Sequence, residues 1–172
     1  MIGRRLTRLA AALSLAALLA LGCSRAQPGD SPWVAEAERR HALADERLEA
    51  GDGAAARDAL RGIVDARVPG DVPDAARRGV LQDTYFRLAR IDLDARDPRA
   101  ALADANRGLT LGIAHDLFGA NLLVVRGAAN EALGEGPAAA ADYHQALMIN
   151  DQLLAETLDA APRGPRAPGA AP

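Results

Sequence analysis

The chain has 172 residues, and its 20 basic residues, all arginine, are outnumbered by 23 acidic ones, which gives a net charge of −3. This length suits one folded domain with additional targeting or linker segments. The acidic balance argues against nucleic-acid binding, which needs clustered basic charge. The single cysteine, Cys23, excludes an internal disulfide. Alanine, leucine, arginine and acidic residues in helical spacing, with no alternating β-branched run, predict an all-α fold.

The first 22 residues have the pattern of a secretory signal peptide. Three arginines precede an apolar stretch over residues 9–22 that only Ser14 interrupts. A bilayer span needs about 20 apolar residues, so this shorter stretch suits a signal-peptide core better than a membrane anchor. It ends in the sequence Leu-Ala-Leu-Gly-Cys at residues 19–23.

This ending resembles the lipobox of bacterial lipoproteins, in which a small residue precedes a cysteine that is lipidated and becomes the first residue after cleavage. Gly22 and Cys23 fit the pattern, whereas Leu21 is bulkier and Ala20 smaller than is usual there. The resemblance implies cleavage before Cys23 and a covalent lipid on it, with no other cofactor. Ser24 stands where Asp would retain a lipoprotein in the inner membrane, which implies the periplasmic face of the outer membrane. The alternative is an ordinary signal peptide with a chance cysteine.

Three further segments follow the signal peptide. Residues 23–34 are predicted to be a flexible tether, because Pro28, Gly29 and Pro32 disfavour regular structure. A helical domain is predicted over residues 35–160. The Pro/Gly/Ala-rich residues 161–172 are expected to form a disordered tail.

The helical domain contains three stretches that align in one register, at residues 51–64, 96–111 and 134–149. Each begins with a turn that carries one acidic residue. A small residue lies eight positions before the acid, an alanine four positions after it and an apolar residue twelve positions after it. In chain order these four residues are Ala44, Asp52, Ala56 and Val64 in the first stretch, Ala89, Asp97, Ala101 and Leu109 in the second, and Gly127, Glu135, Ala139 and Leu147 in the third. The pattern predicts three helical hairpins whose small residues allow close helix packing.

Individual residues add detail to these hairpins. Asp52 and Asp97 are predicted to cap the second helices, and Pro98 and Pro137 suit a first helical turn. Residues 66–76 are interpreted as an insertion. The residues expected to fill the space between hairpins are Leu43, Leu60, Leu88, Leu102, Leu123 and Tyr143.

Two further predictions concern the ends of helices. Asp74, within the insertion, is predicted to cap the long helix that follows it. Residues 151–160 are predicted to form a separate closing helix, in which Leu153, Leu154 and Leu158 cover the open end of the stack.

The last hairpin, residues 124–150, resembles the tetratricopeptide repeat: Gly127, Ala139, Tyr143 and Ala146 occupy the family's small, small, aromatic and small places. The resemblance implies a short right-handed superhelix of about three hairpins plus a capping helix. The turn acids are 45 and then 38 residues apart, longer than the family period of about 34, so irregular stacking is expected between the first two hairpins. A generic alanine-rich helical bundle is the alternative.

Catalytic and metal-binding patterns are not found in the sequence. His41, His115 and His144 are isolated from other metal-ligating residues, so no metal is expected and each is interpreted as a surface or half-buried histidine. Asp92 and Asp94 are neighbouring carboxylates that we expect on a solvated helix face. An enzyme is therefore disfavoured.

The repeat resemblance implies instead a groove for a protein partner, lined by the first helix of each hairpin. The groove places fall on His41, Asp45, Phe86, Arg90, Val124 and Ala128, with Asn121 and Glu131 nearby. Phe86 is either an apolar anchor for the partner or part of the core. The expected function is a membrane-anchored scaffold in cell-envelope assembly or maintenance. The alternatives are a structural subunit of a larger envelope complex and a small-ligand-binding protein.

Overall fold

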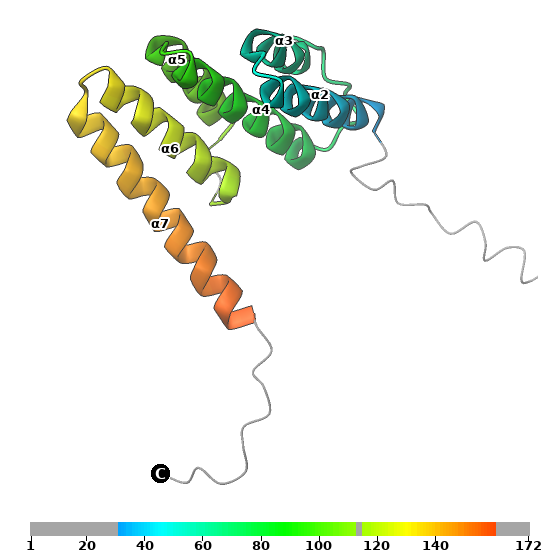
Figure 1. Ribbon diagram of the computed structural model, residues 1–172. Helices are drawn as coiled ribbons and strands as arrows, with labels where there is room; N and C mark the ends of the chain where they lie inside the picture. The colour runs from blue at the N-terminus through cyan, green and yellow to red at the C-terminus, as the bar shows by residue number, and fades with distance from the viewer. Residues whose placement is uncertain (1–30, 113–114, 161–172) are drawn as a thin grey trace, which may run out of the picture.

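The computed structural model describes residues 31–112 and 115–160, and these form helices without any strand (Figure 1). The prediction of an all-α fold is confirmed. In chain order the helices are α2 (Pro32–Glu49), α3 (Gly53–Val64), α4 (Asp74–Asp94), α5 (Pro98–Thr110), α6 (Leu117–Ala132) and α7 (Gly136–Ala160).

Consecutive helices pair into three hairpins, α2 with α3, α4 with α5 and α6 with α7. The hairpins follow one another in space, because α3 packs against α4 and α5 packs against α6. The first helices also contact each other, α2 with α4 and α4 with α6. In Figure 1 the last helix, α7, projects well beyond the body formed by the others.

Each hairpin turn has a residue in the left-handed region directly before the turn acid. These residues are Gly51 (φ 76°), Arg96 (φ 61°) and Gly134 (φ 82°). The carboxylates of Asp52 and Asp97 then accept hydrogen bonds from the backbone N–H groups of Ala55 and Ala100, both at 3.0 Å. The predicted caps of α3 and α5 are therefore confirmed.

Asp74 does not cap α4 as predicted. Pro73 occupies the N-cap position, and Asp74 is the first residue of the helix. Its carboxylate accepts a hydrogen bond from Arg77 Nη2 at 2.7 Å, one turn further along the helix. Asp74 acts in this first turn as an acidic residue near the positive end of the helix dipole.

The small residues of the repeat register are buried between paired helices, as predicted. They are Ala44, Ala56, Ala89, Ala101, Gly127 and Ala139. Among the residues predicted to fill the space between hairpins, Leu60, Leu88 and Leu123 are fully buried and Leu102 is half-buried. The prediction was wrong for Leu43 and Tyr143, which are exposed.

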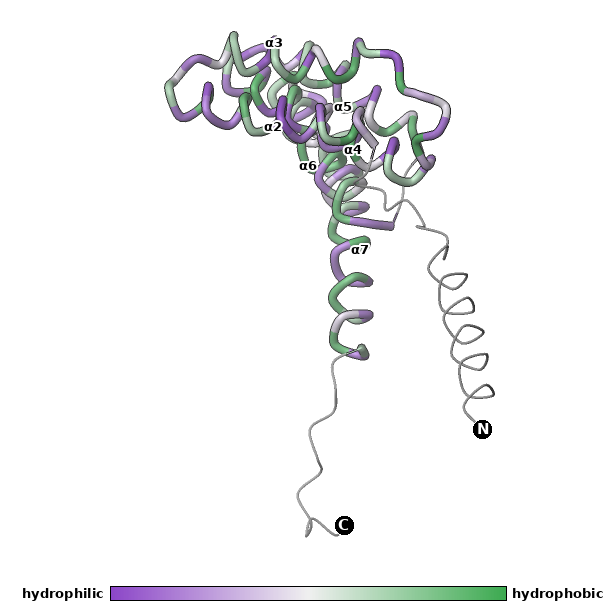
Figure 2. Tube along the Cα trace, turned by 90° about the vertical axis from the view of Figure 1, so that its right-hand side faces the viewer, coloured by the Kyte–Doolittle hydropathy of each residue, from purple (hydrophilic) through white to green (hydrophobic). Residues whose placement is uncertain are grey.

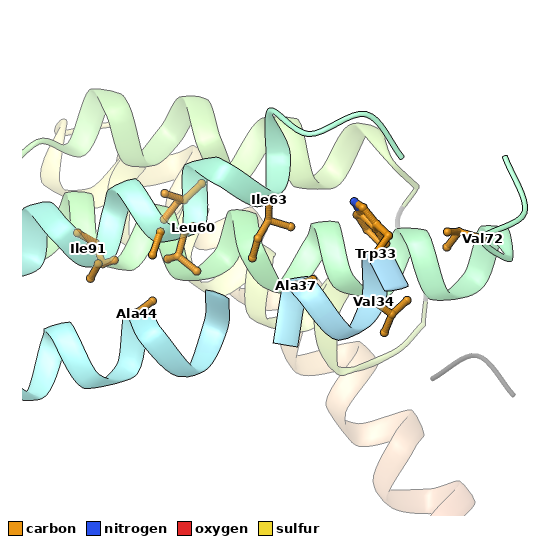
Figure 3. Packing of buried hydrophobic residues seen from close by; sticks show 11 residues of the cluster. Trp33, Val34, Ala37, Ala44, Leu60, Ile63, Val72 and Ile91 are labelled. Atoms are coloured by element: carbon orange, nitrogen blue, oxygen red, sulfur yellow. The ribbon is translucent and has the colours of Figure 1, made fainter. Parts of the chain in front are cut away.

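The core consists of three clusters of buried residues that share two aromatic side chains of α4. The first joins α2, α3 and α4 and includes Trp33, Leu60 and Ile91 (Figure 3). The second and third lie between α4, α5, α6 and α7. Tyr85 packs against the first and second clusters, and Phe86 packs against the second and third.

The first cluster corrects the predicted start of the folded domain. Helix α2 begins at Pro32, three residues before the expected boundary, and the buried side chains of Trp33 and Val34 join this cluster. Residues 32–34 therefore belong to the folded body and not to the tether. Proline is tolerated in a first helical turn, and burial of Trp33 and Val34 favours helix formation over an extended tether.

The predicted insertion corresponds to the connection between α3 and α4, and its residues 65–73 form no helix. Val72 of this segment is buried in the first cluster, and Val68 packs against it. The insertion thus covers one side of the first hairpin, where Trp33 also lies.

The separate closing helix predicted over residues 151–160 was wrong. Helix α7 runs without interruption from Gly136 to Ala160, because no glycine or proline follows Pro137 within it. Leu153 packs against the second cluster, but Leu154 and Leu158 are exposed. With 25 residues α7 is about 37 Å long, whereas the 16 residues of α6 give about 24 Å.

Candidate functional site

An open hollow of about 250 Å³ lies between α2 and α4. We call it the α2/α4 hollow, and its lining residues are Asp45, Leu48, Asp83, Phe86, Arg87, Arg90, Ile91 and Asp94. The α4 residues recur at helical spacing, which places them along one side of that helix. Three predicted groove residues, Asp45, Phe86 and Arg90, are brought together here.

Three of the residues that line this hollow are apolar. Phe86 is half-buried, Ile91 is buried and Leu48 is exposed. The guanidinium carbon of Arg90 lies 5.8 Å from the centroid of the Phe86 ring, within the range of a cation–π contact. Phe86 thus lines the hollow and also packs against two core clusters.

The charges around the hollow fall into two groups. Arg87 binds two carboxylates, Asp45 Oδ1 at 2.7 Å and Asp83 Oδ2 at 2.9 Å. Arg90 and Asp94 are exposed and form no ion pair with any residue that the structure describes. Arg90 is therefore available to an acidic group of a partner, and Asp94 to a basic group.

His41 is half-buried between α2 and α4 and does not line the hollow. Its Nε2 lies 2.9 Å from Thr84 Oγ1, and Nδ1 lies 3.6 Å from Asp83 Oδ2. Because the Thr84 hydroxyl donates to the Val80 carbonyl oxygen, it accepts the hydrogen bond from His41 Nε2–H. Burial lowers the pKa of His41 and Arg87 adds to this effect, against the opposing carboxylates of Asp83, Asp45 and Glu38. His41 holds α2 against α4.

The other predicted groove residues lie on α6 and not in the α2/α4 hollow. Asn121, Val124 and Glu131 are exposed, and Ala128 is half-buried. Glu131 accepts a hydrogen bond from the Tyr143 hydroxyl at 2.9 Å, so it also links α6 to α7. The candidates from the sequence are thus split between two surfaces.

A second hollow, of about 430 Å³, continues from the first toward the turn ends of the first two hairpins. It shares Leu48, Ile91 and Asp94 with the α2/α4 hollow and adds Arg57 and the start of α3. Sequence reasoning missed Leu48 as a site residue. Its position three residues after Asp45 on the same helix is the signal that indicates it.

Two ion pairs with buried carboxylates join the first two hairpins. Asp92 is fully buried and pairs with Arg57 of α3, which corrects the expectation that it lies on a solvated face; only Asp94 is exposed. The buried carboxylate of Asp104 binds Arg61 at 2.6 Å, also from α3. Both pairs connect the first hairpin to the second, and they cannot be recognised from spacing within one helix.

The last hairpin has a similar pair within it. Arg126 binds the buried carboxylate of Asp142 through Nε and Nη2, and Asn130 Nδ2 donates to the same carboxylate at 3.0 Å. This network fixes α6 against α7.

The remaining candidates give no further site. His115 and His144 are exposed, and in the described part of the chain no three His, Cys, Asp or Glu residues are grouped to hold a metal ion. Gly22 and Cys23 lie outside the described residues. None of the helices between residues 31 and 160 has the length and apolar character needed to cross a membrane.

Comparisons with known proteins give no match: no family model, no curated protein and no solved structure is similar to this chain.

Proposed function

We propose that this protein is a membrane-anchored lipoprotein on the periplasmic face of the outer membrane, and that its tetratricopeptide-like hairpins bind a protein partner. The proposed role is that of a scaffold in cell-envelope assembly or maintenance, with no chemistry of its own. Lipid on Cys23 would hold the helical body at the membrane surface. Anchoring of this kind raises the effective concentration of a bound partner there.

The α2/α4 hollow is the observation that carries this proposal. Its lining combines the apolar residues Leu48, Phe86 and Ile91 with the exposed charges of Arg90 and Asp94. A partner chain that places an apolar side chain on Phe86 and a carboxylate on Arg90 would satisfy both features. Buried aromatic residues next to arginine are frequent energetic centres of protein interfaces.

The shape of the site favours a protein over a small ligand. Ligand sites are usually concave cavities that enclose most of the ligand. Here the α2/α4 hollow is open and continues into a second hollow through Leu48, Ile91 and Asp94. An extended segment or a helix of a partner can lie along such a surface.

The experiment is crosslinking in intact cells, followed by purification through a C-terminal tag and mass spectrometry. Phe86→Ala is unsuitable because Phe86 also supports two core clusters. Arg90→Glu is preferred because Arg90 is exposed, and Arg99→Glu, an exposed arginine on α5, is the matched control. One dominant envelope protein that is lost with Arg90→Glu and retained with Arg99→Glu is the expected result. Absence of any partner contradicts the scaffold and favours a small-ligand-binding protein. Retention of the partner with Arg90→Glu, or equal loss in both variants, contradicts the α2/α4 hollow as its binding site.

The lipid anchor is tested in the same preparation. We expect the intact mass to show cleavage before Cys23 and the addition of a diacylglyceryl group, and Cys23→Ser to lose both the added mass and membrane association. A protein cleaved elsewhere and free of lipid contradicts the anchor without contradicting the groove.

A permanent structural subunit is a second candidate, favoured by the exposed leucines of α7 (Leu147, Leu154 and Leu158). Such a subunit would co-purify with its complex in fixed stoichiometry without crosslinking, whereas a scaffold with exchangeable partners would lose them on dilution.

A further inference from the structure

Equivalent positions in the three hairpins differ in how they are covered. The position twelve residues after the turn acid is Val64 in α3, Leu109 in α5 and Leu147 in α7. Val64 packs against the first core cluster, and Leu109 is only 7% exposed. Leu147 is 57% exposed. The last hairpin therefore leaves open a face that the preceding hairpins bury.

Helix α6 covers this face in the second hairpin. Leu109 lies in one cluster with Ala120, Leu122 and Leu123 of α6, and a Cβ atom at Gly108 would come within 2.7 Å of the Leu122 side chain. Within the part of the chain that the structure describes, no helix takes the corresponding place beside α7. The missing element is thus a helix with an apolar face.

The open face continues along the projecting end of α7. Leu147, Leu154 and Leu158 are seven and then four residues apart, which places them on one side of the helix. We call them the apolar stripe. Leu154 and Leu158 are 58% and 66% exposed, and Figure 2 shows the carboxyl-terminal part of α7 projecting beyond the other helices. Three aligned and exposed leucines on one helix are typical of an interaction surface.

The charges next to the apolar stripe are all negative. Asp151 lies within the stripe, four residues after Leu147 and three before Leu154, Asp159 directly follows Leu158, and no arginine lies between residues 147 and 160. The partial negative charge of the helix carboxyl end adds to theirs, because the last turn of α7 contains no basic residue. A basic partner would complement this surface.

A second copy of the chain is a poor occupant. The position thirteen residues before the turn acid, Leu122 in α6, is Arg39 in α2, and its side chain is 67% exposed. Leu43 is the one large exposed apolar residue between Arg39 and Glu46 on this side of the helix, so α2 has no continuous apolar face to continue the stack beyond α7. Pairing α7 with the α7 of another copy would bring together two sets of acidic residues without a base.

We propose that the apolar stripe of α7 binds an amphipathic helix of a different protein, with apolar residues at helical spacing and arginine or lysine beside them. This helix takes the place beside α7 that α6 takes beside α5, and its basic residues face Asp151 and Asp159. The surface lies on α7, apart from the α2/α4 hollow, and it does not depend on the proposed groove.

The test is photo-crosslinking of the full chain in intact cells, with benzoylphenylalanine placed at position 154. Position 145 is the matched control, because Gln145 is exposed on the same helix nine residues away, which is half a turn out of phase. We expect a crosslink from position 154 and not from position 145. The crosslinked peptide, sequenced by mass spectrometry, is expected to be an amphipathic segment of another protein that carries arginine or lysine.

Charge reversal tests the proposed complementarity. Asp151→Arg combined with Asp159→Arg is expected to lower the crosslink yield from position 154 about fivefold. Asp58→Arg combined with Asp71→Arg makes the same change in net charge at exposed positions away from α7 and is expected to leave the yield unchanged. If the two double variants give the same crosslink yield, the proposal of a basic partner is overturned. The proposal is also overturned by a crosslink to α7 of a second copy, by one to residues 161–172 of the same chain, and by the absence of a crosslink.

Discussion

The ring of Tyr143 lies against Gly127, and a Cβ atom at Gly127 would come within 2.6 Å of Tyr143 Cε1. The two residues belong to α6 and α7, and the Tyr143 hydroxyl also donates to Glu131 one turn further along α6. The absence of a side chain at position 127 therefore sets how closely the two helices of the last hairpin approach.

Gly127→Val is expected to lower the free energy of unfolding by about 2 kcal/mol, because the added methyl groups overlap the Tyr143 ring. The measurement is urea unfolding followed by circular dichroism. In a Tyr143→Ala background the same substitution is expected to cost much less, since the overlap is gone. A similar loss in both backgrounds contradicts the packing described for this hairpin.

Arg126→Leu leaves the buried carboxylate of Asp142 without its counter-ion. Arg126 lies nine residues before the turn acid of its hairpin. The same position in the second hairpin is Leu88, so leucine fits the helix. We expect a loss of about 3 kcal/mol, measured by urea unfolding. Adding Asp142→Asn, which removes the charge and keeps a partner for Asn130, is expected to restore at least half of it. No restoration would show that lost packing, and not the unpaired charge, causes the effect.

Arg96 has a φ of 61°, where Gly51 and Gly134 stand in the other two turns. Arg96→Gly is expected to raise the free energy of unfolding by about 0.5 kcal/mol, because relief of the left-handed strain exceeds the entropy that glycine adds to the unfolded chain. Gly134→Ala is expected to lower it by about 1 kcal/mol. Thermal and urea unfolding measure both changes, and a destabilising effect of Arg96→Gly contradicts this account.

The lowered pKa of His41 makes stability depend on pH. Its ordinary value is 6.5, so between that value and the lower folded-state pKa the unfolded chain binds more protons, and stability rises with pH in this window. The contribution is complete above pH 6.5 and is lost as pH falls through the folded pKa. Urea unfolding at pH 7.5 and 5.0 should show a smaller decrease in stability for His41→Gln than for the original chain. Equal decreases would assign the pH dependence to other groups.

Local signals in the sequence predicted the hairpins correctly. Asp52 and Asp97 cap their helices because an acid after a left-handed turn residue meets free backbone N–H groups, a relationship that spans only three residues. Asp116 also caps its helix, α6, because its carboxylate accepts a hydrogen bond from the Gly119 N–H at 2.9 Å. The small residues of the register are buried for an equally simple reason, since they allow helices to approach.

Long-range contacts set the limit of such reasoning. Asp92 and Asp94 are two residues apart, yet only Asp92 is buried, because Arg57 reaches it from another hairpin. The candidate groove was also predicted in part. Asp45, Phe86 and Arg90 line one hollow, whereas His41 bonds to Thr84 and the α6 candidates lie on another surface. The packing of whole hairpins determines which side of each helix stays exposed, and this packing cannot be read from local spacing.

Tyr85 and Phe86 are adjacent in the chain, and between them they contact all three core clusters. In a simple array of repeats, each unit is stabilised by itself and by its nearest neighbours, and the ends can unfold first. Here one dipeptide in the middle hairpin ties the clusters on both sides of it together. The body is therefore expected to unfold cooperatively, in a single transition, and a disturbance of α4 would reach both ends of the molecule.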